Sequence, residues 1–141
     1  MEVSCPSKRM HERKKRVLVI DDDPDARVLV QSLLEAEGFE VRTAADGREG
    51  LDLQDGEPAD VVVTDIFMPN KDGLETIQEL RRKFPHTSIV VVSGGGSATR
   101  NIDYLHIARL LGATHTLQKP VQPDVLVDVV RGLARLPAGE G

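Results

Sequence analysis

Three carboxylates, one hydroxyl and one lysine follow four predicted strands of the sequence, and these residues are the best suited to chemistry. They are Asp21, Asp22, Asp65, Ser93 and Lys119. Carboxylates held close together repel one another and raise one another's pKa, and a hard divalent cation removes that cost. Mg²⁺ favours oxygen ligands and is often bound by one or two carboxylates together with a substrate phosphate. The set therefore predicts a magnesium-assisted phosphoryl-transfer site.

The five residues can be given separate roles. We expect Asp22 and Asp65 to be direct cation ligands, and Asp65 to be the nucleophile, because it stands alone whereas Asp21 and Asp22 are adjacent and better placed to hold the cation. A carboxylate nucleophile in this setting forms an aspartyl phosphate. Lys119 can pair with Asp65 and later with a phosphate oxygen, and the Ser93 hydroxyl can donate to another oxygen. Together they neutralise charge on a transferring phosphoryl group.

Each of these features also has an ordinary structural interpretation. An Asp-Asp pair after a strand often forms a turn, and Asp23 is expected to cap a helix. Ser93 precedes three glycines and could be only a loop residue, while Lys119 before Pro120 could be a solvated lysine before a turn. The coincidence of all the features at successive strand ends favours the functional interpretation.

Short apolar runs, several of them rich in branched residues, predict five strands. The predicted strands are Val17–Ile20, Glu40–Ala44, Val61–Val63, Ile89–Val92 and Ala113–Leu117. The first, third and fourth are continuous apolar runs too short for helices, which is typical of strands buried on both faces of a sheet. The strongest candidates therefore belong in the middle of a covered sheet.

Stretches with helical spacing separate the predicted strands. They are Pro24–Glu37, Asp46–Gln54, Asp72–Phe84, about Asn101–Leu111, and Gln122–Leu136. The first is marked at both ends, since Asp23 can cap free backbone amides and Gly38 supplies a left-handed stop. Its apolar residues Leu29, Leu33 and Leu34 are expected to face the sheet.

Five alternations of strand and helix with short connections imply parallel strands joined by right-handed crossovers, with helices on both faces. The predicted fold is a doubly wound α/β sandwich. In such sheets ligands bind beyond the carboxyl ends of the strands, where the winding reverses. The chemically capable residues are expected to converge at that edge.

Composition limits the alternatives. A chain of 141 residues is about one domain long, and its net charge of −5 makes direct DNA binding unexpected. No apolar run approaches the roughly 20 residues needed to span a bilayer, and no secretory signal is visible, so a cytoplasmic location is expected. We expect residues 1–15 to form a disordered basic leader, 16–136 the folded domain, and 137–141 a frayed tail.

The order of these motifs resembles the receiver domains of two-component response regulators, over about Arg16 to Leu136. The residues that carry the resemblance are Asp21-Asp22, Asp65, Met68-Pro69, Asp72-Gly73, Ser93 and Lys119-Pro120. The resemblance implies a flavodoxin-like (βα)₅ fold with a parallel sheet in the order 2-1-3-4-5. It also implies that a histidine kinase or phosphotransfer protein delivers a phosphoryl group to Asp65.

The resemblance further implies a ligand set for Mg²⁺, with Mn²⁺ as a possible substitute. Asp22, Asp65 and the Phe67 backbone carbonyl would bind the cation, and Asp21 would act mainly through water. The sequence departs from the family at Thr116, where most receivers have an aromatic residue that moves inward on phosphorylation. The usual aromatic switch therefore cannot operate unchanged, although His115 or Tyr104 could substitute for it.

The predicted function is that of a signalling module rather than an enzyme in its own right. We expect a stand-alone receiver without an output domain, a monomer or weak homodimer, whose phosphorylation switches binding to a downstream protein. One alternative is a phosphorylation-independent dimeric binding scaffold. Another is a Mg²⁺-dependent phosphohydrolase that also forms an aspartyl phosphate, but such an enzyme needs a second acid/base group and a substrate pocket. The sequence shows neither.

Overall fold

The computed structural model describes residues 15–66, 73–93, 106–119 and 121–134. Its elements in chain order are β1 (Arg16–Ile20), α2 (Pro24–Ala36), β2 (Glu40–Ala44), α3 (Gly47–Gly56), β3 (Val61–Asp65), α4 (Gly73–Lys83), β4 (Ser88–Ser93), β5 (His115–Gln118) and α6 (Pro123–Ala134). Residues 106–111 are also helical. The expectations for Phe67, Tyr104, Pro120, most of the leader and the tail fall outside the described residues.

Most predicted elements agree with the structure to within two residues at each end. Within that margin, two differences affect the site. Strand β5 begins at His115 rather than at position 113, and β3 and β4 each extend further than predicted at their carboxyl ends. Asp65 and Ser93 are the last residues of β3 and β4 instead of following them. Their strand hydrogen bonding therefore fixes the backbone of both residues directly.

All five strands are parallel and lie in the order β2-β1-β3-β4-β5, which confirms the predicted doubly wound topology. The winding reverses between β1 and β3, because β2 lies on one side of β1 while the later strands lie on the other. Ile20 pairs with Thr64 across this boundary, so the next residues, Asp21 and Asp65, end up side by side. The reversal point thus coincides with the predicted site.

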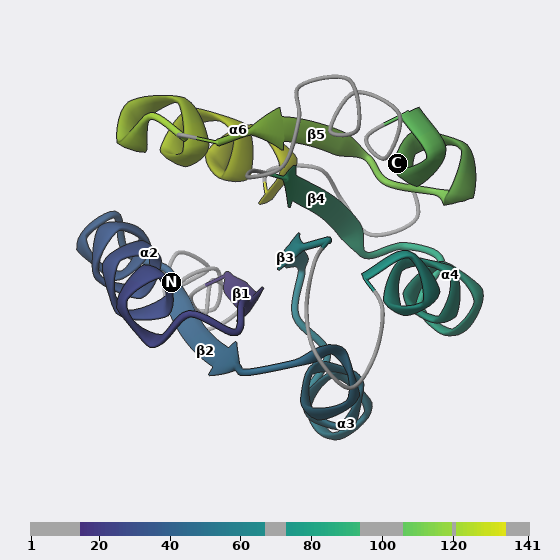
Figure 1. The fold of residues 1–141 in the computed structure, drawn as a ribbon. Coiled ribbons are helices and arrows are strands. Elements are labelled where there is room, and N and C mark those ends of the chain that lie inside the picture. The colour runs from purple at the N-terminus through teal and green to yellow at the C-terminus, as the bar shows by residue number, and fades with distance from the viewer. Residues whose placement is uncertain (1–14, 67–72, 94–105, 120, 135–141) are drawn as a thin grey trace, which may run out of the picture.

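Alternate residues of each central strand point to opposite faces of the sheet. Val19 and Val63 belong to the core beneath α2 and α6. Ile20 and Val62 belong to the second core, beneath α3 and α4. Figure 1 shows the two pairs of helices on opposite sides of the sheet, with residues 106–111 beside α4. Because both faces are covered, the continuous apolar runs are required rather than accidental.

Helix α2 has the predicted ends, and its predicted buried face is right at Leu34, partly right at the half-buried Leu33 and wrong at Leu29. The Asp23 carboxylate accepts a hydrogen bond from the Asp25 amide at 3.0 Å, and Gly38 has a φ of 95°. Leu34 is fully buried, but Leu29 is 59% exposed, so the prediction that Leu29 faces the sheet is wrong. Val30, one turn before Leu34 on the same side of the helix, packs against the core instead.

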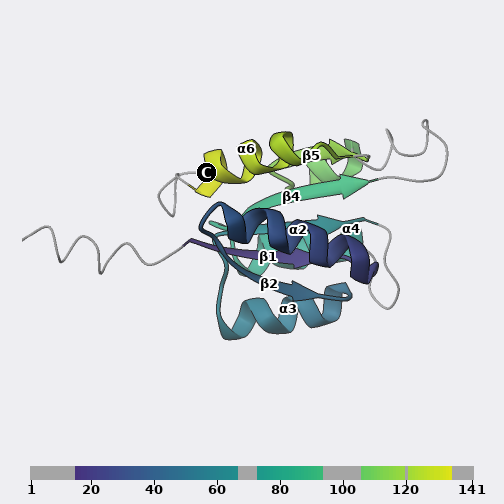
Figure 2. The same cartoon turned by 90° about the vertical axis from the view of Figure 1, so that its left-hand side faces the viewer.

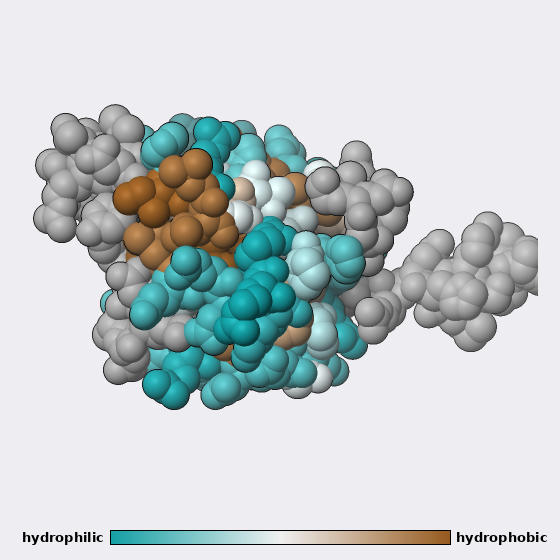
Figure 3. Space-filling view, turned by 90° about the vertical axis from the view of Figure 1, so that its right-hand side faces the viewer, coloured by the Kyte–Doolittle hydropathy of each residue, from teal (hydrophilic) through white to brown (hydrophobic). Residues whose placement is uncertain are grey.

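Seen from the side, the strands run in one direction, and their carboxyl ends together form one edge of the sheet, the carboxyl edge (Figure 2). Figure 3 shows the face that carries α4 and residues 106–111, where apolar side chains gather on the surface. Ile107 and Leu110 on this segment are exposed. Among the described residues, none of the helices has the length and apolar character needed to cross a membrane.

Glycine at position 73 is required by the close approach of α4 to the end of β3. A Cβ atom there would lie 2.4 Å from the Ile66 carbonyl oxygen and 2.5 Å from the Ile66 Cα atom. We predict that Gly73→Ala lowers the free energy of unfolding by about 1–3 kcal/mol, because backbone atoms must shift. Denaturant unfolding followed by circular dichroism measures the change.

Gly132→Ala provides the matched control, because Gly132 is a helical glycine of α6 with no atom within 4 Å of its added Cβ. That variant should be more stable than the native chain by roughly 0.5–1 kcal/mol, since alanine loses less backbone entropy in a helix. Equal effects from the two substitutions would contradict the close approach at Gly73.

Candidate metal and phosphoryl-transfer site

The carboxyl edge brings three aspartates together. Asp21 and Asp22 directly follow β1, and Asp65 ends the neighbouring β3. One carboxylate oxygen of each lies within 4.8 Å of the others. Asp21 and Asp65 are buried, whereas Asp22 is exposed. This arrangement gives a cluster of hard oxygen donors that is open to solvent on the Asp22 side.

Asp21 is held tightly within this cluster. Its amide donates to the Ala44 carbonyl at 3.0 Å, which extends the pairing of β1 with β2 by one residue. Its Oδ1 accepts a hydrogen bond from the Asp23 amide at 2.9 Å. Burial raises the pKa of Asp21 above its ordinary value, and the charges of Asp65 and Asp22 raise it further, against the lowering effects of the Asp23 amide and Lys119. Without a cation, charge on Asp21 is therefore costly.

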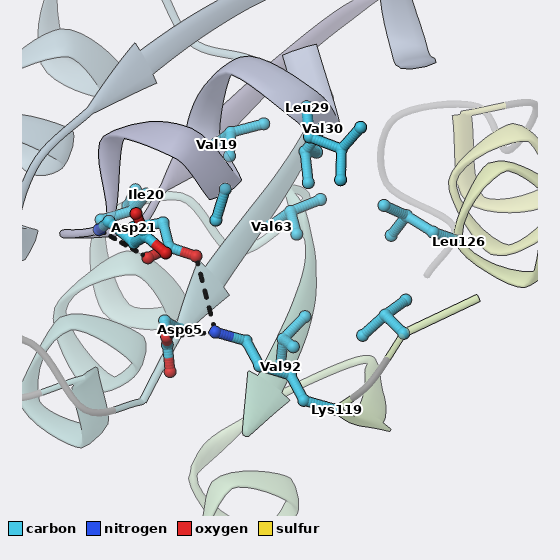
Figure 4. A pocket seen from close by; sticks show the side chains of 13 residues that line it. Val19, Ile20, Asp21, Leu29, Val30, Val63, Asp65, Val92, Lys119 and Leu126 are labelled. Atoms are coloured by element: carbon cyan, nitrogen blue, oxygen red, sulfur yellow. Dashed lines mark hydrogen bonds and ion pairs between the residues drawn. The ribbon is translucent and has the colours of Figure 1, made fainter. Parts of the chain in front are cut away.

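Lys119 follows β5 and reaches across the edge to the aspartates (Figure 4). Its Nζ donates to Asp65 Oδ2 at 3.0 Å and lies 3.7 Å from Asp21 Oδ2. Burial by itself lowers the pKa of Lys119, but the hydrogen bond to Asp65 and the nearby carboxylate charges raise it overall. The ammonium group is therefore protonated at neutral pH and offsets part of the negative charge.

Ser93 ends β4 next to the partner of Asp65, because Asp65 pairs with Val92. Its side chain is fully buried, and its carbonyl accepts a hydrogen bond from the Lys119 amide at 2.8 Å. The same residue thus anchors the backbone of Lys119. In β5, Thr116 is half-buried and His115 is exposed. The structure brings Asp21, Asp22, Asp65, Ser93 and Lys119 to one edge.

An apolar cavity of about 500 Å³ adjoins the cluster between α2 and α6. Figure 4 shows Val19, Val63 and Val92 on its sheet side and Asp65 with Lys119 at its polar end. Such walls reduce the number of waters that can screen the charges, so interactions among the aspartates and Lys119 are stronger than on an open surface.

The donor set fits a hard divalent cation such as Mg²⁺. All three donors are carboxylate oxygens, and the cluster lies next to solvent, which Mg²⁺ needs because it keeps several of its waters. Soft-metal ligands are absent from this described group of donors. The predicted Phe67 carbonyl ligand lies outside the described residues.

One contact in the cluster was not predicted from the sequence. The Arg27 guanidinium donates from Nη1 to the Asp21 backbone carbonyl at 2.7 Å. The available signal was the position of Arg27 in the first turn after the Asp23 cap, because helical side chains lean toward the helix N-terminus.

The fold and the site define a doubly wound α/β protein with a carboxylate and lysine cluster at its switch point. In comparisons with known proteins, residues 17–131 match the family described as the response regulator receiver domain. The protein is 35% identical over 120 residues to the transcriptional regulatory protein CpxR of Escherichia coli K12, a match that covers 85% of this chain and 49% of CpxR. It is 36% identical over 120 residues to TcrA of Mycobacterium tuberculosis H37Rv, a match that covers 85% of this chain and 46% of TcrA. The chain thus spans about half the length of these curated relatives.

Solved structures give the same result. The receiver domain of NtrX from Brucella abortus superposes with a TM-score of 0.79 at 32% identity, covering 86% of this chain and 99% of that one. A CheY-like receiver domain protein from Methanospirillum hungatei JF-1 gives a TM-score of 0.78 at 28% identity, covering 86% and 94%. The chain belongs to the response regulator receiver domain family of two-component signalling. Receiver domains of this family are phospho-accepting signalling modules that bind Mg²⁺ at an acidic cluster.

The raised pKa of Asp21 gives a pH-dependent prediction for the metal-free protein. Because the folded state binds the Asp21 proton more tightly than the unfolded state, this residue lowers stability as the pH rises above 3.8, its ordinary pKa. Asp21→Asn in the presence of chelator should therefore raise the free energy of unfolding at neutral pH, on the order of 1 kcal/mol. The gain should disappear as the pH falls below that ordinary value.

Denaturant unfolding at a series of pH values measures this difference. Added Mg²⁺ should reverse the order of stability, because the native chain gains more from a bound cation than the variant does. A stability difference that does not change with pH would contradict the assignment to Asp21.

Proposed function

We propose that this domain accepts a phosphoryl group on Asp65 in a Mg²⁺-dependent reaction. The observation that carries the proposal is the position of Lys119 Nζ, 3.0 Å from Asp65 Oδ2 at one end of a three-carboxylate cluster. In this proposal the donor is a phosphohistidine of a histidine kinase or phosphotransfer protein. The phosphorylated domain then binds a downstream protein differently from the unphosphorylated one, at an expected cytoplasmic location.

The chemistry follows from the residues present. An Asp65 carboxylate oxygen attacks the phosphorus atom, the bond from phosphorus to the donor imidazole nitrogen breaks, and the imidazole leaves with the electron pair. Lys119 releases Asp65 and pairs with a phosphoryl oxygen, while the Ser93 hydroxyl donates to another. Asp22, Asp65, the Phe67 carbonyl and, through water, Asp21 would hold Mg²⁺, which would supply positive charge to neutralise the phosphoryl oxygens.

Two features support a slow, stoichiometric acceptor over a phosphohydrolase. The cavity beside Asp65 is lined mainly by apolar side chains, and its charged groups are those already assigned. Among the described residues, no histidine belongs to the cluster, whose members are Asp21, Asp22 and Asp65. A turnover enzyme needs a further acid/base group close to the acceptor.

Intact mass spectrometry tests the acceptor assignment. With Mg²⁺ and a small-molecule phosphodonor, we expect a single phosphoryl adduct on the native chain and none on Asp65→Asn or on a sample with chelator. Asp52→Asn is the control, because Asp52 is an exposed carboxylate of α3 away from the cluster. An adduct that persists in Asp65→Asn would contradict the proposal. If no adduct forms with small donors, incubation with a phosphorylated histidine kinase decides.

One observation favours the alternative of a phosphorylation-independent dimeric scaffold. Ile107 is 40% exposed and Leu110 is 73% exposed on the same short helical segment, an apolar surface of the kind found in protein contacts (Figure 3). Sedimentation of the native chain and of Leu110→Ser, each with and without phosphorylation, separates the two functions. Equal self-association in both phosphorylation states supports the scaffold.

A further inference from the structure

Arg27 contacts the turn formed by residues 21–23, and it has no part in the phosphoryl transfer proposed above. It is the fourth residue of α2, and its amide donates to the Asp23 carbonyl at 3.0 Å in the first helical turn. Its half-buried side chain extends back past the start of the helix, and Nη1 donates to the Asp21 carbonyl at 2.7 Å. A charged donor at this distance makes one of the stronger hydrogen bonds found in proteins.

The carbonyl that Arg27 holds belongs to the peptide group between Asp21 and Asp22. Because a peptide group is planar, fixing the orientation of this carbonyl also fixes the direction in which the chain enters Asp22. Asp21 has independent support, since its amide bonds to the Ala44 carbonyl and its carboxylate to the Asp23 amide. Asp22 differs, because its exposed carboxylate has no hydrogen bond or ion pair with any residue that the structure describes. The position of Asp22 therefore depends mainly on the backbone that leads into it.

The contact involves the backbone of Asp21 rather than a carboxylate. The Arg27 guanidinium bonds to the Asp21 carbonyl oxygen, whereas the donors of the candidate cation site are side-chain oxygens of Asp21, Asp22 and Asp65. The contact therefore occupies none of the three carboxylates that would hold the cation.

We propose that Arg27 is a positioning residue for the divalent cation, which fixes Asp22 through the Asp21 carbonyl. The inference rests on the proposed Mg²⁺ site and adds to it a residue that does not touch the cation or the phosphoryl group. Residues that orient metal ligands typically change metal affinity by about 10- to 100-fold when they are removed. The Arg27 contact belongs to this kind of support, and a value near the lower limit is expected for an exposed ligand.

Calorimetric titration of the full chain with Mg²⁺ tests the proposal. Arg27→Met keeps an unbranched apolar stem and removes the donors, and it should weaken Mg²⁺ binding about tenfold. Arg27→Gln keeps an N–H donor without charge, and Arg27→Lys keeps both a donor and the charge on a different geometry. Partial recovery in both variants is expected if the hydrogen bond is responsible. Recovery in Arg27→Lys alone would show that charge matters and would overturn the proposal.

Two further measurements distinguish a positioning role from direct contact with the phosphoryl group. In the metal-free protein, the NMR order parameter of the Asp22 amide should be lower in Arg27→Met than in the native chain, because the peptide between Asp21 and Asp22 is no longer held. Phosphorylation of Arg27→Met by a small donor should be slow at low Mg²⁺ and approach the native rate at saturating Mg²⁺. A rate that stays low at saturation would indicate direct contact with the phosphoryl group, contrary to a positioning role.

Arg131→Met is the matched control. Arg131 is another half-buried helical arginine, and it pairs with Glu37 at the other end of α2. This control should lose some thermal stability and keep native Mg²⁺ affinity. Native or tighter Mg²⁺ affinity in Arg27→Met overturns the inference about Arg27. Absence of Mg²⁺ binding by the native chain overturns the metal site itself, so the two failures are distinguishable.

Discussion

Repulsion among three carboxylates at one end of the sheet is the constraint on which the rest of the site depends. Asp21 and Asp65 are buried beside each other because β1 and β3 are paired in a fixed parallel register. An unbalanced cluster of this kind costs stability because two of its three carboxylates are buried. Lys119 offsets part of the negative charge, and a divalent cation is suited to offset the remainder.

Packing and backbone hydrogen bonds hold the carboxylates together despite their repulsion. Both faces of the central strands are packed against helices, so β1, β3 and β4 cannot move apart to relieve the repulsion. The backbone is tied at each strand end, as where the Ile66 amide bonds to the Val92 carbonyl and the Lys119 amide to the Ser93 carbonyl. Burial of the two apolar cores therefore stabilises a carboxyl edge at which the carboxylates lie close enough together to bind a cation.

Support for the site also extends beyond the groups that take part in chemistry. Gly73 allows α4 to begin directly against the backbone that follows Asp65. Arg27 reaches from α2 to the backbone between Asp21 and Asp22, the two acidic residues that follow β1. Both contacts involve main-chain atoms, which makes them insensitive to the identity of neighbouring side chains. A site assembled from strand ends depends on such contacts because its ligands lie beyond the regular hydrogen bonding of the sheet.

Local patterns in the sequence predict the strands, the ends of α2 and most residues of the candidate site. The continuous branched runs indicated buried parallel strands, because only strands covered on both faces carry apolar residues at every position. Strand ends of a parallel sheet meet at one edge, so the sequence alone places Asp21, Asp22, Asp65, Ser93 and Lys119 together. The Asp23 cap and the Gly38 stop are local interactions and were equally accessible.

Long-range packing decided what the sequence alone did not. Whether Leu29 or Val30 meets the core depends on the rotation of α2 over the sheet and on its separation from α6, and a helical repeat with several apolar residues does not fix that rotation. Gln54 is a polar residue in a helix, yet it is fully buried because the Ala59 backbone and the Thr87 hydroxyl satisfy its amide. The bond from Arg27 to the Asp21 carbonyl likewise requires the actual angle between β1 and α2. Sequence motifs indicate which residues form a site, whereas contacts between residues far apart in the sequence depend on how the whole chain packs.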